Sequence, residues 1–533
     1  MSSPVKPLNS DGRLDWDVVV IGSGHAGSCA AHAAVDAGVP GPRVLVLDKC
    51  PPEWVGGNGY FTAGAHRTTH GGLHDLLPLV SNVSPELVPK IDVPPYTSSQ
   101  FSDDIFRMGE GRNAEGLVKT VVEGSRDAVQ WLKDRVGVDF TLSFNRQAYV
   151  VDGVQRFWGG MALSTRDGGK GLIRAHRNAL ERANVQTWFE SRAIELIQED
   201  GRITGVVVEK DGKTVVVRAK AVVLAAGGFE ASREEREKHL GKAWSEARVR
   251  GTPYNTGDGI RMAAAAGARL QGDFAGCHST CWDASAAPDQ GSRELSNQYT
   301  KSGYPLGIMV NANGERFVDE GVDFRNYTYA VYGRAILNEP RGYAFQIFDQ
   351  KGVKWLREEE YGDGVIEKIW AEDIEQLADE MRPCGLIHRL RFQRTVREYN
   401  EAVHNEQEKH PERVWDPTVK DGISTGDGLS VRKSNWALSL EEGPFLAVKV
   451  SCGITFTFGG VAIDPATAAV LSEDGKSIEG LFATGEMVGG LFYGNYPGGS
   501  GLTAGAVFGR HAGREAARIV EKLSAAVELA DNS

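Results

Sequence analysis

VVVIGSGHAG, residues 18–27, is an apolar run that opens into a Gly-x-Gly-x-x-Gly motif. Gly22 allows the chain to turn tightly off a strand, and Gly24 removes the Cβ that would block a pyrophosphate. Gly27 lets the following helix pack close to the sheet. The stretch therefore predicts a dinucleotide site in which the N-terminus of a helix faces the phosphates.

A second apolar run, residues 44–47, supplies the next strand of such a site. It ends at Asp48, about 20 residues after the last glycine of the motif, where a carboxylate accepts hydrogen bonds from an adenosine ribose. Together with the flanking strand, helix and acidic residue, the motif indicates a dinucleotide site more specifically than Gly-x-Gly-x-x-Gly does alone.

Three further Gly-rich segments favour FAD over NAD. Residues 56–59 (GGNG) suit a close approach of the backbone to a flat ligand. Residues 221–229 and 480–486 each show the pattern of a buried strand that enters a glycine turn. An NAD domain does not need these segments, whereas a long cofactor laid across a sheet does. We therefore expect FAD.

The composition is that of a nucleotide-binding α/β enzyme, with 65 glycines among 533 residues and 41% hydrophobic residues. No apolar run reaches the roughly 18 residues that a membrane helix needs, and the N-terminal residues lack the apolar core of a signal peptide. We therefore expect a cytoplasmic protein without a transmembrane segment. The net charge of −12 argues against a nucleic-acid partner, because such binding needs a basic face.

The six cysteines form no Cys-x-x-Cys for an iron–sulfur cluster and no Cys-x-x-Cys-His for haem. Cys277 and Cys281 lack the second pair of ligands that a zinc site needs. We therefore expect no metal site. Electrons from the flavin must then reach oxygen, a quinone or a separate acceptor protein.

The pattern along the chain predicts an α/β fold in which a Rossmann-like FAD-binding domain carries an inserted α+β capping domain. The predicted division is a mobile tail at 1–14, the FAD-binding domain at 15–272 and 441–533, and the capping domain at 273–440. Helical periodicity predicts helices at 113–136 and 171–183, and a hairpin is expected within 206–217. The substrate site would then lie between the domains.

Motifs spread over nearly the whole chain resemble the fumarate reductase/succinate dehydrogenase flavoprotein superfamily. Besides the segments above, they are residues 256–263 (TGDGIRMA), 310–317 (VNANGERF), 485–486 (GE) and 508–510 (FGR). Within the superfamily, residues 250–257, 319–324 (DEGVDF) and 453–458 (GITFTF) most resemble the tricarballylate dehydrogenase branch. The resemblance implies FAD, a mobile capping domain, and oxidation or reduction of a carbon–carbon bond next to a carbonyl or carboxylate.

Together, the motifs and the resemblance define a predicted FAD site. Its residues are Gly22, Gly24, Ala26, Gly27, Asp48, Lys49, Gly57, Asn58, Gly59, Ala226, Gly227, Gly228, Asp258, Glu486, Gly501 and Leu502. Relatives with covalent flavin have a histidine in the region of residues 56–65, where this chain has none. We therefore expect noncovalent FAD, although His66 lies just beyond.

Desaturation requires a group that removes a proton from Cα while a hydride leaves Cβ for the flavin. In fumarate reductases, an arginine after an Arg-Phe-x-x-Glu motif transfers this proton. Here the motif, residues 316–320, is followed by Arg325, one residue later than in that pattern. Arg325 is therefore the first candidate, with a carboxylate clamp or an ion pair with Asp323 or Glu320 as its alternatives.

The resemblance also implies substrate ligands. His278 matches a family histidine that holds a substrate carboxylate, and Thr280 follows at the family spacing. Thr455 stands where dicarboxylate reductases carry a histidine pair. Arg250, with Arg325, Arg334 and Lys301, lies in segments expected to border the cleft, and such cations can neutralise a di- or tricarboxylate.

Tyr496 marks a departure from the dicarboxylate reductases, which have an Asn-Arg clamp where this chain has Asn495-Tyr496. The loss of the clamp and of the histidine pair argues against fumarate or succinate. Residues 495–501 instead resemble 3-ketosteroid dehydrogenases, in which a tyrosine hydroxyl and a glycine amide polarise a ketone. Tyr496 is either such a donor or a packing aromatic beneath the flavin.

The leading hypothesis is an FAD-dependent dehydrogenase that desaturates a small polycarboxylate, with tricarballylate oxidised to an aconitate. One alternative is an enzyme similar to 3-ketosteroid dehydrogenases or fumarate reductases that acts on another substrate. The other is a non-catalytic flavin electron-transfer protein. In each enzyme hypothesis, Arg325, Tyr496 and His278 form the catalytic set.

Overall fold

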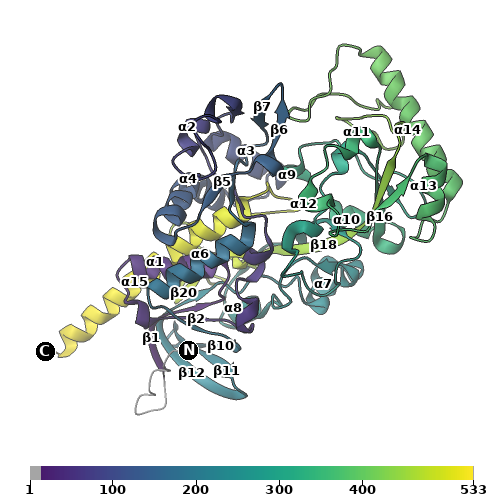
Figure 1. Cartoon of the computed structure of the whole chain (residues 1–533). Helices are drawn as coiled ribbons and strands as arrows, with labels where there is room; N and C mark the ends of the chain where they lie inside the picture. Colours follow the sequence, from purple (N-terminus) through teal and green to yellow (C-terminus); the bar gives the residue numbers. More distant parts are fainter. Residues whose placement is uncertain (1–13, 532–533) are drawn as a thin grey trace.

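The structure is a computed structural model that describes residues 14–531. The predicted tail at 1–14 lies outside the described residues except for Leu14, which begins the first strand. The described chain forms two large sheets that meet where the dinucleotide motif and the inserted region come together (Figure 1).

The first sheet has eight strands and is built around the dinucleotide motif. Its order is β10-β11-β20-β12-β1-β2-β9, with β19 paired to β20. Strand β1 runs parallel to both of its neighbours, so that Val18 faces Ala221 on one side and Val44 on the other. The strand bounds are β1 Leu14–Ile21, β2 Val44–Leu47, β9 Gln186–Trp188, β10 Ser191–Glu199, β11 Arg202–Lys210, β12 Lys213–Leu224, β19 Ala469–Leu471 and β20 Ser477–Ala483. The predicted hairpin is present as the antiparallel pair β11 and β12.

Two helices, α1 (His25–Asp36) and α15 (Ser500–Asp531), pack closely against each other beside this sheet. A Cβ on Gly513 of α15 would lie 2.2 Å from the carbonyl oxygen of Ala30, so only glycine allows this approach. Helix α15 is the long yellow helix that crosses the first domain in Figure 1. Helices from the early and late parts of the described chain therefore pack together beside the first sheet.

The predicted helices form with small changes in their bounds. The helix expected at 113–136 is α4 (Glu115–Trp131), continued by a π-helical segment at Leu132–Val136 that ends at Gly137 in the left-handed region. The helix expected at 171–183 is α6 (Gly168–Arg182), which begins three residues earlier than expected because Asp167 adopts a left-handed conformation there.

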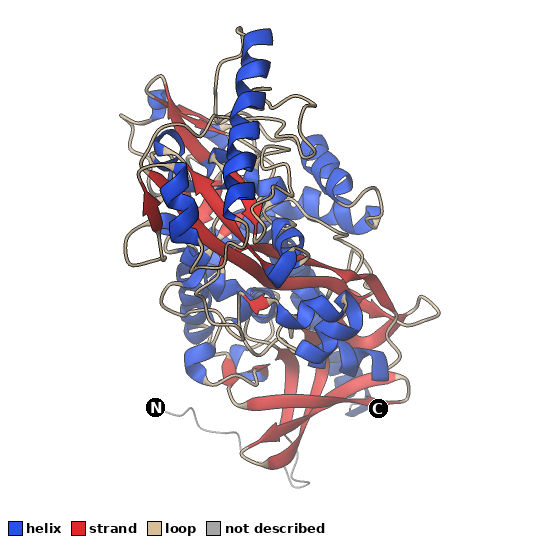
Figure 2. Cartoon of the chain, turned by 90° about the vertical axis from the view of Figure 1, so that its right-hand side faces the viewer, coloured by secondary structure: helices blue, strands red, loops and turns tan. Residues whose placement is uncertain are grey.

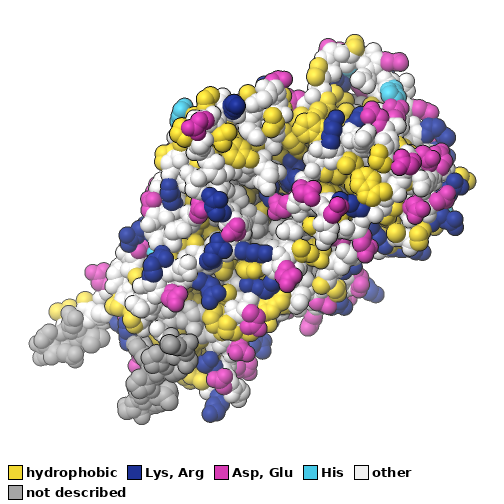
Figure 3. Space-filling view, in the orientation of Figure 1, with side chains coloured by type: hydrophobic (Ala, Val, Ile, Leu, Met, Phe, Trp, Pro, Cys, Tyr) yellow, Lys and Arg dark blue, Asp and Glu magenta, His cyan; other side chains and the backbone are white. Residues whose placement is uncertain are grey.

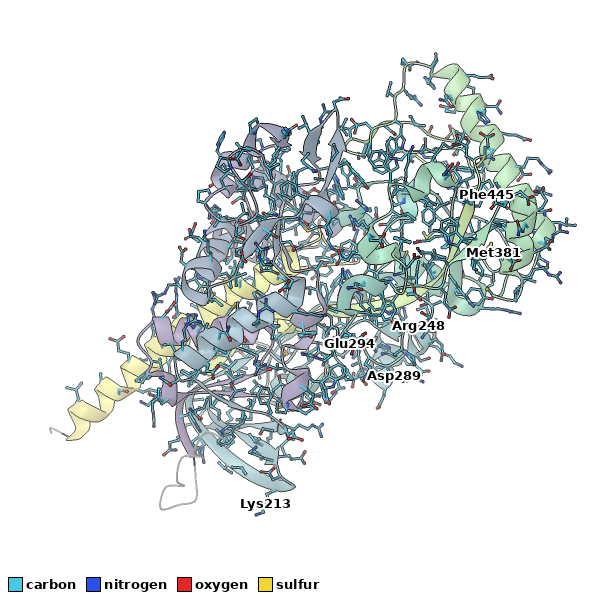
Figure 4. All side chains as sticks on the ribbon, viewed as in Figure 1. Lys213, Arg248, Asp289, Glu294, Met381 and Phe445 are labelled. Carbon is cyan, nitrogen blue, oxygen red and sulfur yellow. The ribbon has the colours of Figure 1, made fainter. Side chains whose placement is uncertain are left out.

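The second sheet combines strands of the predicted insertion at 273–440 with β13, the start of β14 and β18, which lie outside that range. The part of the insertion that carries α13 and α14 lies at the upper right in Figure 1. Its strands are β13 Arg248–Val249, β14 Leu270–Asp283, β15 Ile308–Asn311, β16 Tyr343–Phe348, β17 Ile369–Ala371 and β18 Phe445–Val461. Strands β14 and β18 pair antiparallel over most of their length and lead into and out of the region. Helices α13 (Ile374–Met381) and α14 (Arg389–Lys409) cover this sheet, and Met381 and Phe445 share its apolar core (Figure 4).

Smaller sheets and short helices complete the described chain. Two three-stranded sheets contain β3 Ala65–His66, β5 Phe140–Leu142 and β8 Leu163–Thr165, and β4 Ile91–Asp92, β6 Ala148–Val151 and β7 Val154–Phe157. The remaining α-helices are α2 Leu73–Leu76, α3 Ser98–Met108, α5 Phe144–Gln147, α7 Arg233–Leu240, α8 Asp258–Ala265, α9 Arg325–Thr328, α10 Tyr332–Leu337, α11 Gln350–Val353 and α12 Glu358–Tyr361. Figure 2 shows the strands and helices of both parts from the side.

No helix within residues 14–531 is long and apolar enough to cross a lipid bilayer. Basic and acidic side chains are interspersed over the face seen in Figure 3.

Candidate active site

One large cavity extends from the dinucleotide motif to the contact between the two sheets. The ends of β1, β2 and β12 and the first residues of α1 and α15 line its first half. Residues of α5, α9, α12 and β18 line its far end. The cavity therefore joins a nucleotide-binding sheet to the inserted region.

Along the first half of the cavity, glycines leave the space that a dinucleotide needs. A Cβ on Gly24 would meet no protein atom nearer than the Gly56 carbonyl oxygen, at 3.6 Å, so the missing side chain leaves space in the cavity itself. No side chain caps the start of α1 at Gly24, and this helix N-terminus is therefore open to a phosphate. These features fit the pyrophosphate of FAD.

The adenosine end carries a fixed carboxylate. Asp48 accepts hydrogen bonds from the Ser23 amide (2.8 Å) and hydroxyl (2.6 Å) and from the Cys50 amide (3.0 Å). These bonds orient Asp48 at the end of β2, where it lines the cavity.

A second charged group lies beside this end. Lys49 donates to Asp258 and to the hydroxyl of Thr256, each at 2.6 Å. Burial alone would raise the pKa of Asp258, but Lys49 and Arg192 lower it to about 2. The Asp258 carboxylate therefore stays charged at neutral pH.

Two buried carboxyl groups, Glu230 and Glu486, lie next to the middle of the cavity. Asn58 and Asn255 donate to Glu230 at 2.6 and 2.7 Å, and the Thr457 amide donates to Glu486 at 2.7 Å. Burial and the negative charge of Glu230 raise the pKa of Glu486 well above its usual range. The buried surroundings of Glu486 therefore favour its neutral form.

Most of the predicted FAD residues lie along this cavity. Those that line it are Gly22, Gly24, Ala26, Asp48, Lys49, Gly57, Asn58, Gly59, Ala226, Gly227, Asp258, Glu486, Gly501 and Leu502. Gly27 and Gly228 do not line it. A Cβ on Gly27 would lie 2.0 Å from the Gly22 carbonyl oxygen, and one on Gly228 would lie 2.1 Å from Glu486, so both positions require glycine for packing.

The far end of the cavity is cationic. Four arginines, Arg146, Arg250, Arg325 and Arg357, line it together with a single carboxylate, Glu360. Because all five groups are withdrawn from bulk water, their charges act strongly on a ligand in this space.

Arg250 is held by neutral groups. Its guanidinium donates to the Thr455 hydroxyl (2.9 Å), to the Thr300 hydroxyl (3.3 Å) and to the side-chain oxygen of Asn297. Burial lowers the pKa of Arg250. Its charge is thus positioned in the cavity, and no carboxylate within residues 14–531 pairs with it.

Arg325 is also without a carboxylate partner among residues 14–531. The acids that the sequence offered as its partners are engaged elsewhere: Asp323 pairs with Arg107 at 2.6 Å, and Glu320 pairs with Arg316. The guanidinium of Arg325 lies over the ring of Trp158, 5.1 Å from its centroid. The ion-pair alternative is therefore not what the structure shows, and the charge remains available to a ligand.

An aromatic wall closes one side of the far end. The hydroxyl groups of Tyr329 and Tyr496 hydrogen-bond to each other, and both residues line the cavity. The Phe456 ring packs edge-on against Tyr496, with ring centroids 5.0 Å apart. Tyr496 therefore combines packing with a hydroxyl at the cavity surface.

Two of the predicted substrate ligands, His278 and Thr280, do not line the cavity. His278 lies behind the aromatic wall, stacked on Phe456 and in edge contact with Tyr329. Burial and the charge of Arg250 lower the pKa of His278 well below its usual range. The imidazole is thus neutral and supports the tyrosines from behind.

The sequence did not reveal Arg146, Arg357 or Glu360 as site residues. They lie on short helices or loops from distant parts of the chain and belong to no recognised motif. Arg334 and Lys301, which the sequence placed near the cleft, do not line the cavity. A fully buried carboxylate such as Glu360 is recognisable only once burial is known.

The glycine-lined path, the helix N-termini and the cationic far end define a flavoprotein oxidoreductase. The chain belongs to the family described as FAD binding domain, whose model matches residues 97–502, and to the fumarate reductase/succinate dehydrogenase flavoprotein superfamily. This membership establishes the FAD-binding fold and the FAD cofactor.

Three known proteins illustrate the similarity. The chain is 30% identical over 518 residues to probable fumarate reductase Ifc3 of Shewanella frigidimarina (strain NCIMB 400), which covers 94% of this chain and 74% of the relative. The open conformation of a flavocytochrome c3 fumarate reductase matches with a TM-score of 0.70 and 27% identity, over 95% of this chain and 79% of the other. A 3-ketosteroid delta1-dehydrogenase from Sterolibacterium denitrificans shares the fold, with a TM-score of 0.70, 21% identity and coverage of 95% and 100%.

Proposed function

We propose that this FAD-dependent oxidoreductase acts on a carbon–carbon bond next to a carboxylate of a small polycarboxylate, with tricarballylate and aconitate as the substrate pair. The observation that carries the proposal is the set of four arginines against one carboxylate at the far end of the cavity. Guanidinium groups bind carboxylates through charge-assisted hydrogen bonds, so this imbalance favours a substrate with several negative charges.

The residues around the substrate have separate tasks. Bound FAD would supply the acceptor for the hydride that leaves Cβ. Arg250, fixed by Thr455 and Thr300, holds a substrate carboxylate. Arg325 has no carboxylate partner among the described residues and is our candidate for the group that exchanges the Cα proton.

The Tyr329–Tyr496 pair favours a second candidate function, the dehydrogenation of a bond next to a ketone. A tyrosine hydroxyl at the cavity surface can donate to the oxygen that becomes negative as the proton leaves. Such a substrate would place its carbonyl at Tyr496 and any carboxylate at the arginines. The two candidate functions differ in whether reduction of the flavin requires a ketone.

Anaerobic reduction of the bound flavin tests the proposal. Tricarballylate, succinate and a 3-ketosteroid are added in turn to the FAD-loaded protein, and the visible absorbance of the flavin is followed. Bleaching by tricarballylate alone supports the polycarboxylate function, and bleaching by the ketone alone supports the second candidate. If aconitate reoxidises chemically reduced flavin while tricarballylate does not bleach it, the enzyme is a reductase of the same substrate class.

The proposal extends to the acceptor that takes the electrons from the reduced flavin. No metal-binding motif was recognised in the sequence, and we propose a quinone or a separate protein as acceptor. Steady-state assays compare the turnover with a quinone or an acceptor protein with the turnover with oxygen.

A further inference from the structure

Glu360 is the only carboxylate among the residues that line the far end of the cavity. Its two oxygens take four hydrogen bonds. One accepts from Arg146 (3.1 Å) and Arg357 (3.0 Å), and the other accepts from the amide (2.9 Å) and hydroxyl (2.7 Å) of Ser302. The Glu360 side chain is completely buried, so each of these bonds is made without competition from water.

The two arginines come from distant segments of the chain. Arg146 belongs to α5, in the part assigned to the FAD-binding domain, and Arg357 immediately precedes α12 of the inserted region. The Arg357 guanidinium also donates to the main-chain oxygen of Arg146 at 2.6 Å. Glu360 thus lies at the point where the two segments join.

Without the carboxylate this arrangement would be unstable, because two buried guanidinium groups would face each other. Like charges at this distance repel strongly in a medium of low dielectric constant. The Nε of Arg357 is buried and has no hydrogen-bond partner among the described residues, and an unpaired buried donor is costly unless a ligand accepts from it.

The four arginines form two pairs that differ in whether carboxylates balance their charge. Arg146 and Arg357 are balanced by Glu360 and, on the outer side, by Glu359, which lies 2.6 Å from Arg146. Arg250 and Arg325 have no carboxylate partner among residues 14–531. The cavity therefore offers two uncompensated positive charges beside a rigid pair of guanidinium groups.

We propose that Glu360 is a positioning residue that fixes Arg146 and Arg357 as one wall of the substrate site and thereby selects substrates with at least two carboxylates. The proposal rests on the proposed function and names the residue that orders its site. Glu360 acts through the arginines and has no direct contact with the reacting carbon atoms.

The pKa of Glu360 agrees with this arrangement. Burial alone would raise it, but the charges of Arg357 and Arg146 and the hydrogen bonds from Ser302 lower it to about 2. Burial and the charge of Arg325 lower the pKa of Arg357 to about 10. Both groups are thus charged at neutral pH.

Glu360→Gln tests the proposal, with Glu359→Gln as the matched control. The two acids are neighbours in α12 and both lie near Arg146, but Glu359 is about one-third exposed and does not line the cavity. Binding of tricarballylate and of inorganic sulfate to the FAD-loaded protein is followed by the change in the flavin spectrum, together with the melting temperature and the pH dependence of binding.

For Glu360→Gln we expect the Kd of tricarballylate to rise at least 10-fold and that of sulfate to rise by a smaller factor, with normal FAD content. For Glu359→Gln we expect less than a 3-fold change in either Kd. Equal effects of the two substitutions, or wild-type binding by Glu360→Gln, would overturn the proposal. If wild-type protein binds sulfate but not tricarballylate, and Glu360→Gln weakens sulfate binding, the positioning role stands and the substrate assignment fails.

Ser302→Ala provides a second variant in case Glu360→Gln does not fold. It removes one of the four hydrogen bonds to Glu360 and the bond that Arg357 donates to the Ser302 hydroxyl at 3.0 Å, and it keeps every charge. We expect a roughly 3-fold rise in the Kd of tricarballylate. We also expect a rise in the apparent pKa that the pH dependence of tricarballylate binding gives. An unchanged Kd and an unchanged pH profile would contradict the positioning role.

Discussion

Tyr329 and Tyr496 share a hydrogen bond between their hydroxyl groups at the wall of the substrate cavity. Burial raises the pKa of Tyr496 well above its usual range, and the neighbouring Tyr329 adds to this effect. Tyr496 is therefore protonated at neutral pH. The role proposed for Tyr496, that of a donor to a substrate oxygen, depends on this protonation.

Tyr496→Phe separates the two candidate functions. If the hydroxyl stabilises a developing enolate, the rate of flavin reduction by a ketone falls about 100-fold, because one preorganised donor is worth about 3 kcal/mol. If the substrate is a polycarboxylate held by the arginines, we expect a loss of less than 10-fold. Stopped-flow reduction measures the rate, and Tyr329→Phe serves as the control because it leaves the Tyr496 hydroxyl in place.

Gly24→Ala separates cofactor binding from folding. The added Cβ has no protein atom nearer than 3.6 Å, so the apo protein should keep its melting temperature within about 2 °C. The same methyl group would enter the path of the pyrophosphate, and we expect the Kd of FAD to rise at least 100-fold. Gly428→Ala is the control, because a Cβ there also meets no atom within 4 Å and lies outside the cavity. Normal FAD binding by Gly24→Ala would contradict the assigned path of the cofactor.

Arg325→Ala should abolish flavin reduction without loss of FAD. We expect the reduction rate to fall at least 1000-fold, because both the charge and the proton-exchanging group are lost. Arg334→Ala is the matched control, since Arg334 lies in the next helix but does not line the cavity. A rate within 10-fold of wild type for Arg325→Ala would move the proton-transfer role to another residue of the site.

Three buried histidines predict acid sensitivity. Burial lowers the pKa of His25 and of His70 to about 4 and that of His66 to about 3, whereas an unfolded chain takes up these protons near pH 6.5. The unfolded state therefore binds more protons between about pH 6.5 and pH 4, and the free energy of unfolding falls as the pH falls through this window. Each pKa unit corresponds to about 1.4 kcal/mol for each histidine.

Urea unfolding at several pH values between 7.5 and 4.5 measures this dependence. We expect His66→Asn to reduce the slope of stability against pH, because one buried group that resists protonation is removed. His404→Asn is the control, since His404 is half exposed and pairs with Glu441 at the surface. A slope equal to that of wild type in the His66→Asn variant would show that His66 does not contribute.

The sequence by itself determined the FAD-binding half of the molecule. Gly22, Gly24 and Asp48 follow one another at short range, and their spacing is set by the local geometry of a strand, a turn and a helix. The structure places these residues along one cavity. Local geometry of this kind is encoded within about 30 residues, so that a single sequence is enough to read it.

Only the tertiary structure decided the composition of the substrate end. Arg146 and Glu360 are far apart in the chain and meet because α5 and α12 come together, and no periodicity or motif marks either residue. His278, which family resemblance placed on the substrate, lies behind Tyr329 instead. Side-chain direction and burial at such a junction depend on the packing of whole segments, and the long-range contacts that set this packing leave no local signal in the sequence.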